Sequence, residues 1–304
     1  MLVKKRSESD ELMVLRSLTL RKQLNQKEKN RYNNLEKGYA GEVAFDQLVA
    51  NIHEERLILN DLLFELDYSY FQIDTLIISR GVIHLIDIKN FTGECYLEGD
   101  KLYSVKGDWE YKNPVPQLKR CENLLSQLLQ HFNCNYHIKP SVVFINPTFT
   151  LYQAPIDQPL VLPSQVSHFI KELTNTPLRL TLEDKALAQK LLSLHQTKNP
   201  FIFLPKYSYE ELKRGVYCFE CKSYDIIVKN HNLTCQKCGT SEKVRSVILR
   251  HTQEFALIFP KKKITTTKIY EWCDSVINKK TIQRVLKQKY KTFGKCSGTY
   301  YASS

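Results

Sequence analysis

QIDTLIISRGVIHLIDIKN, residues 72–90, contains two runs rich in isoleucine and leucine that are separated by Arg80-Gly81. A glycine between two such runs favours a tight hairpin turn. We therefore expect antiparallel strands over residues 70–79 and 82–90.

Three ionisable side chains interrupt these apolar runs: Asp74 in the first, and Asp87 and Lys89 in the second. Because side chains alternate along a strand, Asp87 and Lys89 share one face, and the hairpin can bring Asp74 beside Asp87. Such charges are unfavourable among apolar residues unless they are paired or metal-bound. Phosphodiester hydrolysis needs a divalent cation, an activated water and charge neutralisation, for which these groups are suited. The alternative is an Asp87–Lys89 ion pair on a solvated sheet face.

The flanking sequence predicts an α/β fold. Two helices are expected first. One is a polar helix over 8–34, and the other is a helix over 38–52 that contains Gly38 and Gly41. The further expected elements are strands over 57–65, 94–98, 101–105 and 140–146, and helices over 115–131, 163–173 and 183–195. The order of these elements is a helix, several strands, a second helix and a last strand. This order indicates an α/β sandwich and not a regular βαβ repeat.

Residues 38–146 resemble a NERD (nuclease-related) domain, a branch of the PD-(D/E)XK nuclease superfamily. The matching pieces are Gly38-Tyr39-Ala40-Gly41-Glu42, Gln72-Ile73-Asp74, Asp87-Ile88-Lys89-Asn90, Gly93, and Asn113-Pro114 with Gln117. The resemblance covers about a third of the chain. It implies a restriction-endonuclease-like mixed sheet flanked by helices, and a metal-dependent DNA-cleaving activity.

The same resemblance implies roles for individual residues. Asp74 and Asp87 would bind Mg²⁺ or Mn²⁺, and Lys89 would position the attacking water. Glu42 would complete the acidic cluster, and Gln72 and Gln117 would line the site. Asp87 stands where the superfamily often has Glu, and its shorter side chain would shift the metal. From the residues alone, Glu42 also fits an exposed first-turn position favoured by the helix dipole, and Gln117 a solvated helix face.

Four of the nine cysteines form two tight pairs, Cys218-x-x-Cys221 and Cys235-x-x-Cys238, thirteen residues apart. This spacing is typical of a structural zinc site in a zinc ribbon, and four thiolates leave no open position for catalysis. His231 lies in the intervening loop, where it either replaces a ligand or is solvated. The remaining five cysteines have no ligand spacing: Cys95, Cys121, Cys134, Cys273 and Cys296.

Positive charge is concentrated at the two ends of a chain whose net charge is +12. Residues 1–37 carry +5 and residues 261–304 carry +9, which leaves −2 for the remainder. Two short helices are expected in the tail, and the second is decorated by Lys279, Lys280, Arg284, Lys287 and Lys291. This pattern favours nucleic-acid binding and resembles a helix-turn-helix. The alternative is a basic helical hairpin packed on the zinc module.

Together these features predict four segments: a basic N-terminal helix (1–37), a NERD-like core with a helical appendage (38–205), a zinc ribbon (206–260) and a helix-turn-helix-like tail (261–304). No apolar run is long enough for a transmembrane helix, and the charged N-terminus lacks the apolar part of a secretory signal. We therefore expect a cytoplasmic metal-dependent DNA nuclease. The alternatives are a non-catalytic DNA-binding or regulatory protein and an RNA-processing nuclease.

Overall fold

The computed structural model describes residues 1–304 except 51–55, 108, 176–179, 230 and 303–304. It divides into two compact units. Unit 1 consists of Met1–Glu8 and Asn33–Phe201, and unit 2 of Ser9–Tyr32 and Ile202–Ser304. Among the described residues, no helix combines the length and the apolar character that a membrane crossing requires.

A six-stranded mixed sheet forms the centre of unit 1, in the order β1-β2-β3-β4-β8-β10. Its strands are β1 (Leu2–Lys4), β2 (Leu57–Leu66), β3 (Ser69–Ser79), β4 (Val82–Lys89), β8 (His137–Phe144) and β10 (Leu160–Val161). β2, β3 and β4 are antiparallel neighbours, whereas β8 runs parallel to β4. The expected turn joins β3 to β4, and Arg80 and Gly81 both have positive φ, which glycine adopts without strain.

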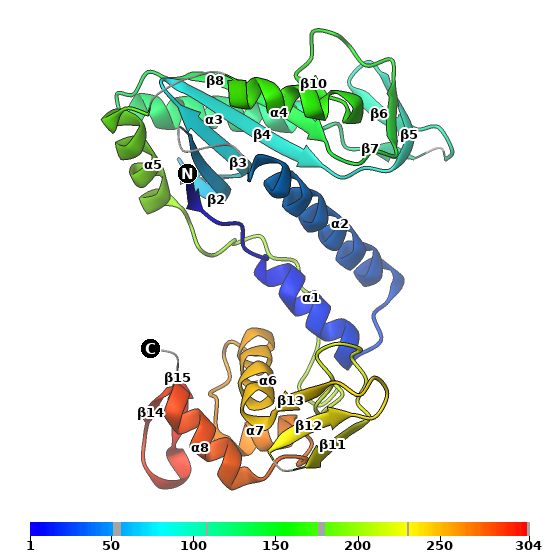
Figure 1. Cartoon of the computed structure of the whole chain (residues 1–304), viewed down its shortest axis with the longest axis vertical. Coiled ribbons are helices and arrows are strands. Elements are labelled where there is room, and N and C mark those ends of the chain that lie inside the picture. The colour runs from blue at the N-terminus through cyan, green and yellow to red at the C-terminus, as the bar shows by residue number, and fades with distance from the viewer. Residues whose placement is uncertain (51–55, 108, 176–179, 230, 303–304) are drawn as a thin grey trace. The chain divides into compact units, whose positions relative to one another are not determined.

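Helices cover both faces of this sheet (Figure 1). They are α2 (Gln26–Val49), α3 (Pro114–His131), α4 (Val166–Asn175) and α5 (Leu182–Leu194), with a short 3-10 turn, η1 (Pro163–Gln165). Ile77 and Ile86 pack with Phe45 of α2 and Leu173 of α4 on one face. The leucines of β3 and β4 pack with α3 and α5 on the other. Burial on both faces explains the nearly continuous apolar runs of these strands.

A smaller sheet in unit 1 has the order β7-β6-β5-β9. Its strands are β5 (Gly93–Glu98), β6 (Lys101–Ser104), β7 (Glu110–Tyr111) and β9 (Phe149–Tyr152). The chain then enters α3 through Asn113, whose side chain accepts a hydrogen bond from the N–H of Val115 and donates to the carbonyl of Asp100. Pro114 follows at the first helical position, where a missing N–H does no harm.

Unit 2 combines the cysteine pairs with a helical module. Its elements are α1 (Asp10–Arg21), β11 (Ile226–Lys229), β12 (Asn232–Cys235), β13 (Ser241–Lys243), α6 (Val244–Ile258), α7 (Thr266–Trp272), α8 (Lys279–Lys289), β14 (Lys291–Phe293), the 3-10 turn η2 (Cys296–Gly298) and β15 (Tyr300–Ala302). Buried Arg21 of α1 pairs with Glu254 of α6 and lies 4.2 Å from the ring centre of Trp272. This network fixes α1 in the core of unit 2.

Two expectations about helices were wrong. The break in the N-terminal helical region lies at residues 22–25 and not near Gly38, because Asn25 and Glu28 exchange side-chain and backbone hydrogen bonds and start α2 there. The expected elements also omitted α6, although its buried residues recur at helical spacing: Val244, Val247, Ile248, Phe255 and Ile258.

Candidate active site

Asp74 and Asp87 meet where the pairing of β3 with β4 ends. The last paired residues are Thr75 and Ile86, and the two acids are the next residues on their strands. The Asp74 carboxylate accepts a hydrogen bond of 2.8 Å from the backbone N–H of Ile88. The Asp74 side chain is therefore hydrogen-bonded to β4, the strand that carries Asp87, and the two acids lie side by side as expected from the hairpin.

Buried Asp87 and half-buried Lys89 form an ion pair on the same face of β4. The Lys89 Nζ lies 2.8 Å from Oδ1 and 2.7 Å from Oδ2 of Asp87. Burial raises the pKa of Asp87 to about 7, the negative charge of Asp74 adds to this effect, and Lys89 opposes it. Burial alone would lower the pKa of Lys89, but Asp87 and Asp74 together raise it, so its ammonium stays charged.

Glu42 of α2 contributes a third carboxyl group to this region. Burial raises its pKa to about 8, the neighbouring charge of Asp74 adds to the shift, and Arg6 opposes it. The Arg6 guanidinium lies 2.9 Å from the Glu42 carboxylate. Glu42 is thus held in place by an arginine, and it is not the solvated first-turn residue that the sequence allowed.

Arg6 itself was not among the predicted site residues. Its side chain is only 3% exposed, and it makes two hydrogen bonds to Asp46 and one to the hydroxyl of Thr75 besides the one to Glu42. Burial alone would lower its pKa, but Asp46 and Glu42 raise it. Its partners are at least 36 residues away in sequence, so no local pattern indicated this role.

Asp61 of β2 is a further acid that the sequence analysis did not single out. It has a positive φ of 54° and lies in the β2–β3 ladder between the pairs Asn60–Thr75 and Leu62–Ile73, opposite Asp74. Its charge also helps to raise the pKa of Glu42. Its oxygens are engaged by Lys4, Ser7 and Gln72.

Close packing of α2 on the end of β4 brings Glu42 to the strand residues. A β-carbon built on Gly41 would lie 2.5 Å from the β-carbon of Asn90 and 3.2 Å from a methyl carbon of Ile145. The Asn90 side chain donates to the carbonyl of Lys37 and accepts from Asn146. Gly41 therefore allows the close approach, whereas Gly38 has open space around it.

The two predicted glutamines lie in different surroundings. Gln72 is exposed, and its amide donates to Asp61 at 3.1 Å. Gln117 lies in the first turns of α3, four residues before Cys121 and on the same side of the helix. Burial raises the pKa of the Cys121 thiol to about 11, and the charges of Asp87 and Asp74 contribute. Gln117 therefore lies on the side of α3 that faces the acids.

The carboxyl groups are suited to a cation site of low ligand number. Among the described residues, only the four paired cysteines place three or more His, Cys, Asp or Glu ligand atoms within 4.8 Å of one another. Glu42, Asp74 and Asp87 therefore form no such group, but Mg²⁺ commonly takes one or two carboxylates and completes its shell with water and phosphate. Buried Oδ2 of Asp87 receives no well-directed hydrogen bond from the described residues. The Lys89 ammonium lies 2.7 Å from this oxygen, so a metal ion bound here would share Oδ2 with Lys89.

The paired cysteines converge as their spacing predicted. Sulfur–sulfur distances are 3.6 Å for Cys218–Cys238 and 3.5 Å for Cys221–Cys235. Four sulfurs at Zn–S bonds of about 2.3 Å would lie about 3.8 Å apart in a tetrahedron, so the cluster fits one Zn²⁺. Lys222 and Gly239 follow the two pairs with positive φ, which closes each knuckle turn. His231 is exposed, in the loop between the pairs.

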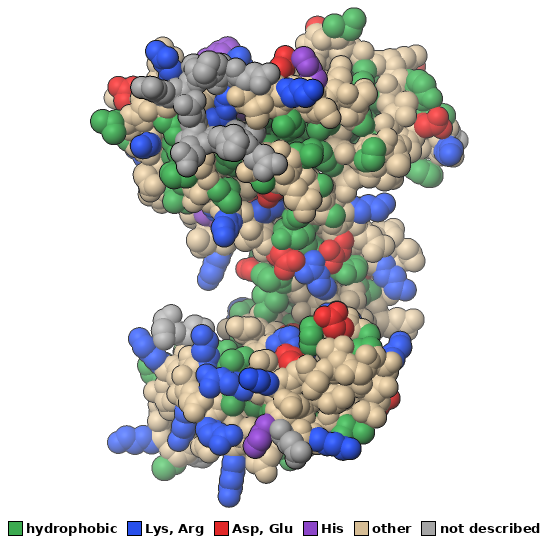
Figure 2. Space-filling model, in the orientation of Figure 1, with side chains coloured by type: hydrophobic (Ala, Val, Ile, Leu, Met, Phe, Trp, Pro, Cys, Tyr) green, Lys and Arg blue, Asp and Glu red, His purple; other side chains and the backbone are tan. Residues whose placement is uncertain are grey.

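The five predicted nucleic-acid-binding residues are all exposed on unit 2. Lys279, Lys280, Arg284 and Lys287 lie on α8, and Lys291 begins β14. Ile282, Val285 and Leu286 form the buried side of α8. Figure 2 shows blue side chains spread over the region that Figure 1 labels α8, β14 and β15. The second tail helix therefore has an apolar inner side and a basic outer side, as expected.

Comparison with known proteins identifies a nuclease-related domain (NERD) at residues 37–145. This range contains Glu42, Asp74, Asp87 and Lys89 but not Arg6. No curated protein matches the chain. Among solved structures, the chain is similar to the crystal structure of protein VC1899 from Vibrio cholerae, with 11% identity and a TM-score of 0.26. The match covers 57% of this chain and 37% of that one.

Proposed function

We propose that this protein is a metal-dependent nuclease that hydrolyses DNA phosphodiester bonds. The nuclease-related domain at residues 37–145 supports a nuclease-related function. The observation that carries the proposal is the position of the Lys89–Asp87 pair beside Asp74 at one end of the central strands. A mixed sheet with helices on both faces also agrees with the restriction-endonuclease-like core that the resemblance implies.

In this proposal Asp74 and Asp87 hold Mg²⁺ or Mn²⁺, which would supply an activated water and neutralise charge on the phosphate. The Lys89 ammonium, held by Asp87, orients the attacking water and stabilises the charge that develops on phosphorus. Glu42, positioned by Arg6, would complete the acidic cluster beside Asp74. Gln117 would contact substrate from α3, and Gln72 would act through Asp61.

Cleavage of supercoiled plasmid DNA with Mg²⁺ or Mn²⁺ tests the site. We expect the wild type to nick the plasmid, and Asp87→Asn and Lys89→Met to lose at least about two orders of magnitude in rate, as when a group that stabilises transition-state charge is removed. Asp100→Asn, an exposed acid in the β5–β6 turn, is the control and should retain wild-type activity. Equal cleavage by Asp87→Asn and wild type would reject this active site.

Two further substrates separate the alternatives. Faster cleavage of single-stranded RNA than of duplex DNA would identify an RNA-processing nuclease. Tight DNA binding without cleavage at any metal concentration would instead identify a non-catalytic DNA-binding or regulatory protein.

Unit 2 is proposed to supply the DNA-binding elements. α7 and α8 are followed by the β14–β15 hairpin, and Ile264 bridges to Tyr301 beside it, so a helical pair is joined to a small wing. The basic outer side of α8 would lie in a DNA groove, and the zinc ribbon would add contacts to the backbone. The separation of apolar and basic sides on α8 supports this use.

Fluorescence anisotropy with a labelled duplex at 50–200 mM salt tests the DNA-binding proposal. Replacing Lys280, Arg284 and Lys287 by glutamine should weaken binding for every sequence and reduce the slope of log K against log salt by about 0.9 for each lost phosphate contact. The matched control is a triple replacement of exposed Lys119, Lys185 and Lys190 in unit 1. Identical salt slopes for the α8 variant and the wild type would place the DNA contacts elsewhere.

A further inference from the structure

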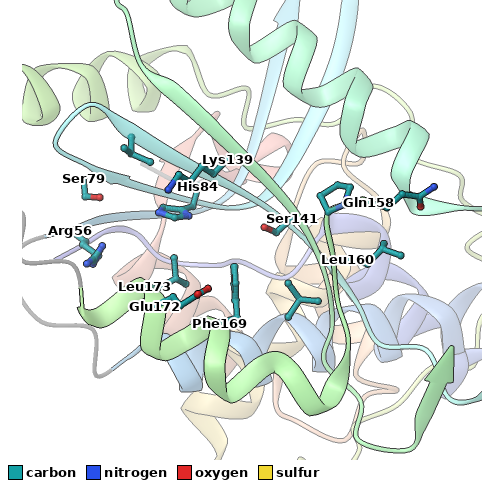
Figure 3. A pocket seen from close by; sticks show the side chains of 13 residues that line it. Arg56, Ser79, His84, Lys139, Ser141, Gln158, Leu160, Phe169, Glu172 and Leu173 are labelled. Carbon is teal, nitrogen blue, oxygen red and sulfur yellow. The ribbon is translucent and has the colours of Figure 1, made fainter. Parts of the chain in front are cut away.

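A cavity of about 650 Å³ lies in unit 1 between helix α4 and the strands β4 and β8 (Figure 3). Its volume falls in the range of small-molecule sites, roughly 300–1,000 Å³. It is separate from the candidate active site. His84 and Lys139 are register partners in β4 and β8, and His84 precedes Lys89 by five residues, roughly 16 Å along the strand. His84 also projects to the opposite face of the sheet from Asp87.

One end of the cavity is cationic. Figure 3 shows Arg56, Ser79, His84 and Lys139 toward the same end. Arg56 is only 3% exposed. Burial lowers the pKa of His84 to about 4, and the positive charges of Lys139 and Arg56 contribute, so the imidazole is neutral at pH 7. Arg56 and Lys139 bring two positive charges to this end (Figure 3) against the one carboxyl group of Glu172, so the balance of charge favours an anionic group there.

Two buried polar atoms in the cavity wall lack hydrogen-bond partners within the described part of the chain. They are Oγ of Ser79, a residue that is 1% exposed, and Oε1 of Gln158. Buried polar atoms are nearly always paired, and an unpaired one is destabilising. The Ser79 hydroxyl can donate to an anion, and the Gln158 oxygen can accept from a ligand N–H. A ligand with both groups would satisfy both atoms.

The rest of the cavity is largely apolar. In Figure 3, Phe169 and Leu173 of α4 lie across from the strands, and Leu160 lies toward the end that holds Gln158. The acid on this helix, Glu172, lies 3.2 Å from His168. Aromatic and aliphatic side chains beside a polar acceptor suit a flat ring with an N–H at its edge.

We propose that this cavity binds a small phosphorylated molecule that carries a flat, N–H-bearing ring, of the size of a mononucleotide. Arg56 and Lys139 attract the phosphate, and the Ser79 hydroxyl donates to one of its oxygens. Phe169 packs against the ring, and Gln158 accepts a hydrogen bond from the ring edge. The site is independent of the proposed nuclease reaction, because it uses neither Asp74, Asp87 nor Lys89.

Isothermal titration of the full chain with adenosine 5′-monophosphate, adenosine and inorganic phosphate tests the proposal. We expect the monophosphate to bind at least about tenfold more tightly than either part alone, because both ends of the cavity are then occupied. Ser79→Ala and Lys139→Ala should each weaken binding by about tenfold, the effect of a hydrogen bond or contact to a charged group. Lys119→Ala, an exposed lysine on α3, is the matched control and should bind like the wild type.

Thermal unfolding without ligand separates binding from folding. Because Ser79→Ala removes a hydroxyl without a described partner, its midpoint should equal or exceed that of the wild type while its affinity falls. Failure of the monophosphate to bind at millimolar concentration would overturn the proposal. So would equal affinity of the wild type, Ser79→Ala and Lys139→Ala. Binding of inorganic phosphate as tight as that of the monophosphate would overturn the role of the ring.

Discussion

The carboxylate of Asp74 accepts a hydrogen bond of 2.8 Å from the backbone N–H of Ile88, the residue between Asp87 and Lys89. An acidic side chain thus takes the place of a backbone acceptor where regular pairing of β3 and β4 has ended at Thr75 and Ile86. The same carboxylate raises the pKa of Asp87 and of Glu42. Asp74 therefore has a structural role and an electrostatic role, and two substitutions can separate them.

Asp74→Asn should keep the structural role and lose the electrostatic one. The amide oxygen can still accept from Ile88, so we expect the thermal midpoint to change little, whereas affinity for Mn²⁺ should fall by an order of magnitude or more. Asp74→Ala should lose both, with an additional destabilisation of about 1–3 kcal/mol for the unsatisfied buried N–H. Thermal unfolding and Mn²⁺ titration of both variants make the comparison. Equal stability of the two variants would contradict the structural role.

Replacement of Arg6 should destabilise unit 1, because Arg6 pairs with two half-buried acids. Arg6→Ala removes the hydrogen-bond donor that Glu42, Asp46 and the hydroxyl of Thr75 share, so unit 1 should lose about 3 kcal/mol in unfolding free energy. Arg6→Lys should restore only part of this loss, because one ammonium cannot form the same set of hydrogen bonds.

Chemical denaturation measures these effects, with Lys5→Ala as the control because Lys5 is the exposed neighbour of Arg6. If Lys5→Ala were as destabilising as Arg6→Ala, the effect would belong to the N-terminal segment as a whole and not to the guanidinium.

Two glycines in the same helix should respond oppositely to alanine. Gly41→Ala places a β-carbon 2.5 Å from that of Asn90, which has no flexible end to move away, so we expect a destabilisation of about 1–3 kcal/mol. Gly38→Ala meets open space and should stabilise the helix by up to about 1 kcal/mol. Thermal unfolding of both variants tests this, and a stabilised Gly41→Ala would contradict the close approach of α2 to β4.

The contrast between Gly41 and Asp74 shows which parts of the site the sequence could predict. The hairpin, its polar residues and the cysteine pairs follow from local spacing, so the placement of Asp74 beside Asp87 could be predicted. The role of Gly41 depends on Asn90, and that of Arg6 on Glu42 and Asp46, across long separations in the chain. The α4 cavity depends likewise on several strands that meet only in the fold.

The metal-free protein should lose stability as the pH rises toward 8. Asp87 and Glu42 have folded-state pKa values of about 7 and 8, above their ordinary values of 3.8 and 4.5. Between the ordinary and the folded-state pKa values, the folded state therefore binds more protons than the unfolded state. The stability that these protons contribute is fully present below about pH 4 and is lost as the pH rises through the folded-state pKa values. His84 and His251, whose pKa values are lowered to about 4, oppose this trend because stability that they contribute is gained as pH rises.

A difference measurement isolates the two carboxyl groups. In EDTA, the thermal midpoint of wild type minus that of Glu42→Gln/Asp87→Asn should fall between pH 5 and 8 by at least about 2–4 °C, which corresponds to about 1 kcal/mol. The comparison uses the slope of this difference with pH and not its absolute size, because the double variant is also destabilised by leaving Lys89 without its partner. Mg²⁺ should raise the wild-type midpoint at pH 8 but not that of the variant. A difference that rises with pH would contradict the raised pKa values.

Zinc should be bound stoichiometrically and should stabilise unit 2 alone. The four ligand sulfurs lie within 4.8 Å of one another in the segment that contains the β11-β12-β13 sheet, whereas unit 1 contains none of them. We expect about one zinc per chain by elemental analysis, and almost none in Cys235→Ser, because a closed four-thiolate site tolerates no missing ligand. Cys296→Ser, at an exposed thiol outside the cluster, should retain the metal. Limited proteolysis after chelation should cut residues 202–302 and spare residues 57–144. Retention of full zinc by Cys235→Ser would show that the metal lies at other residues.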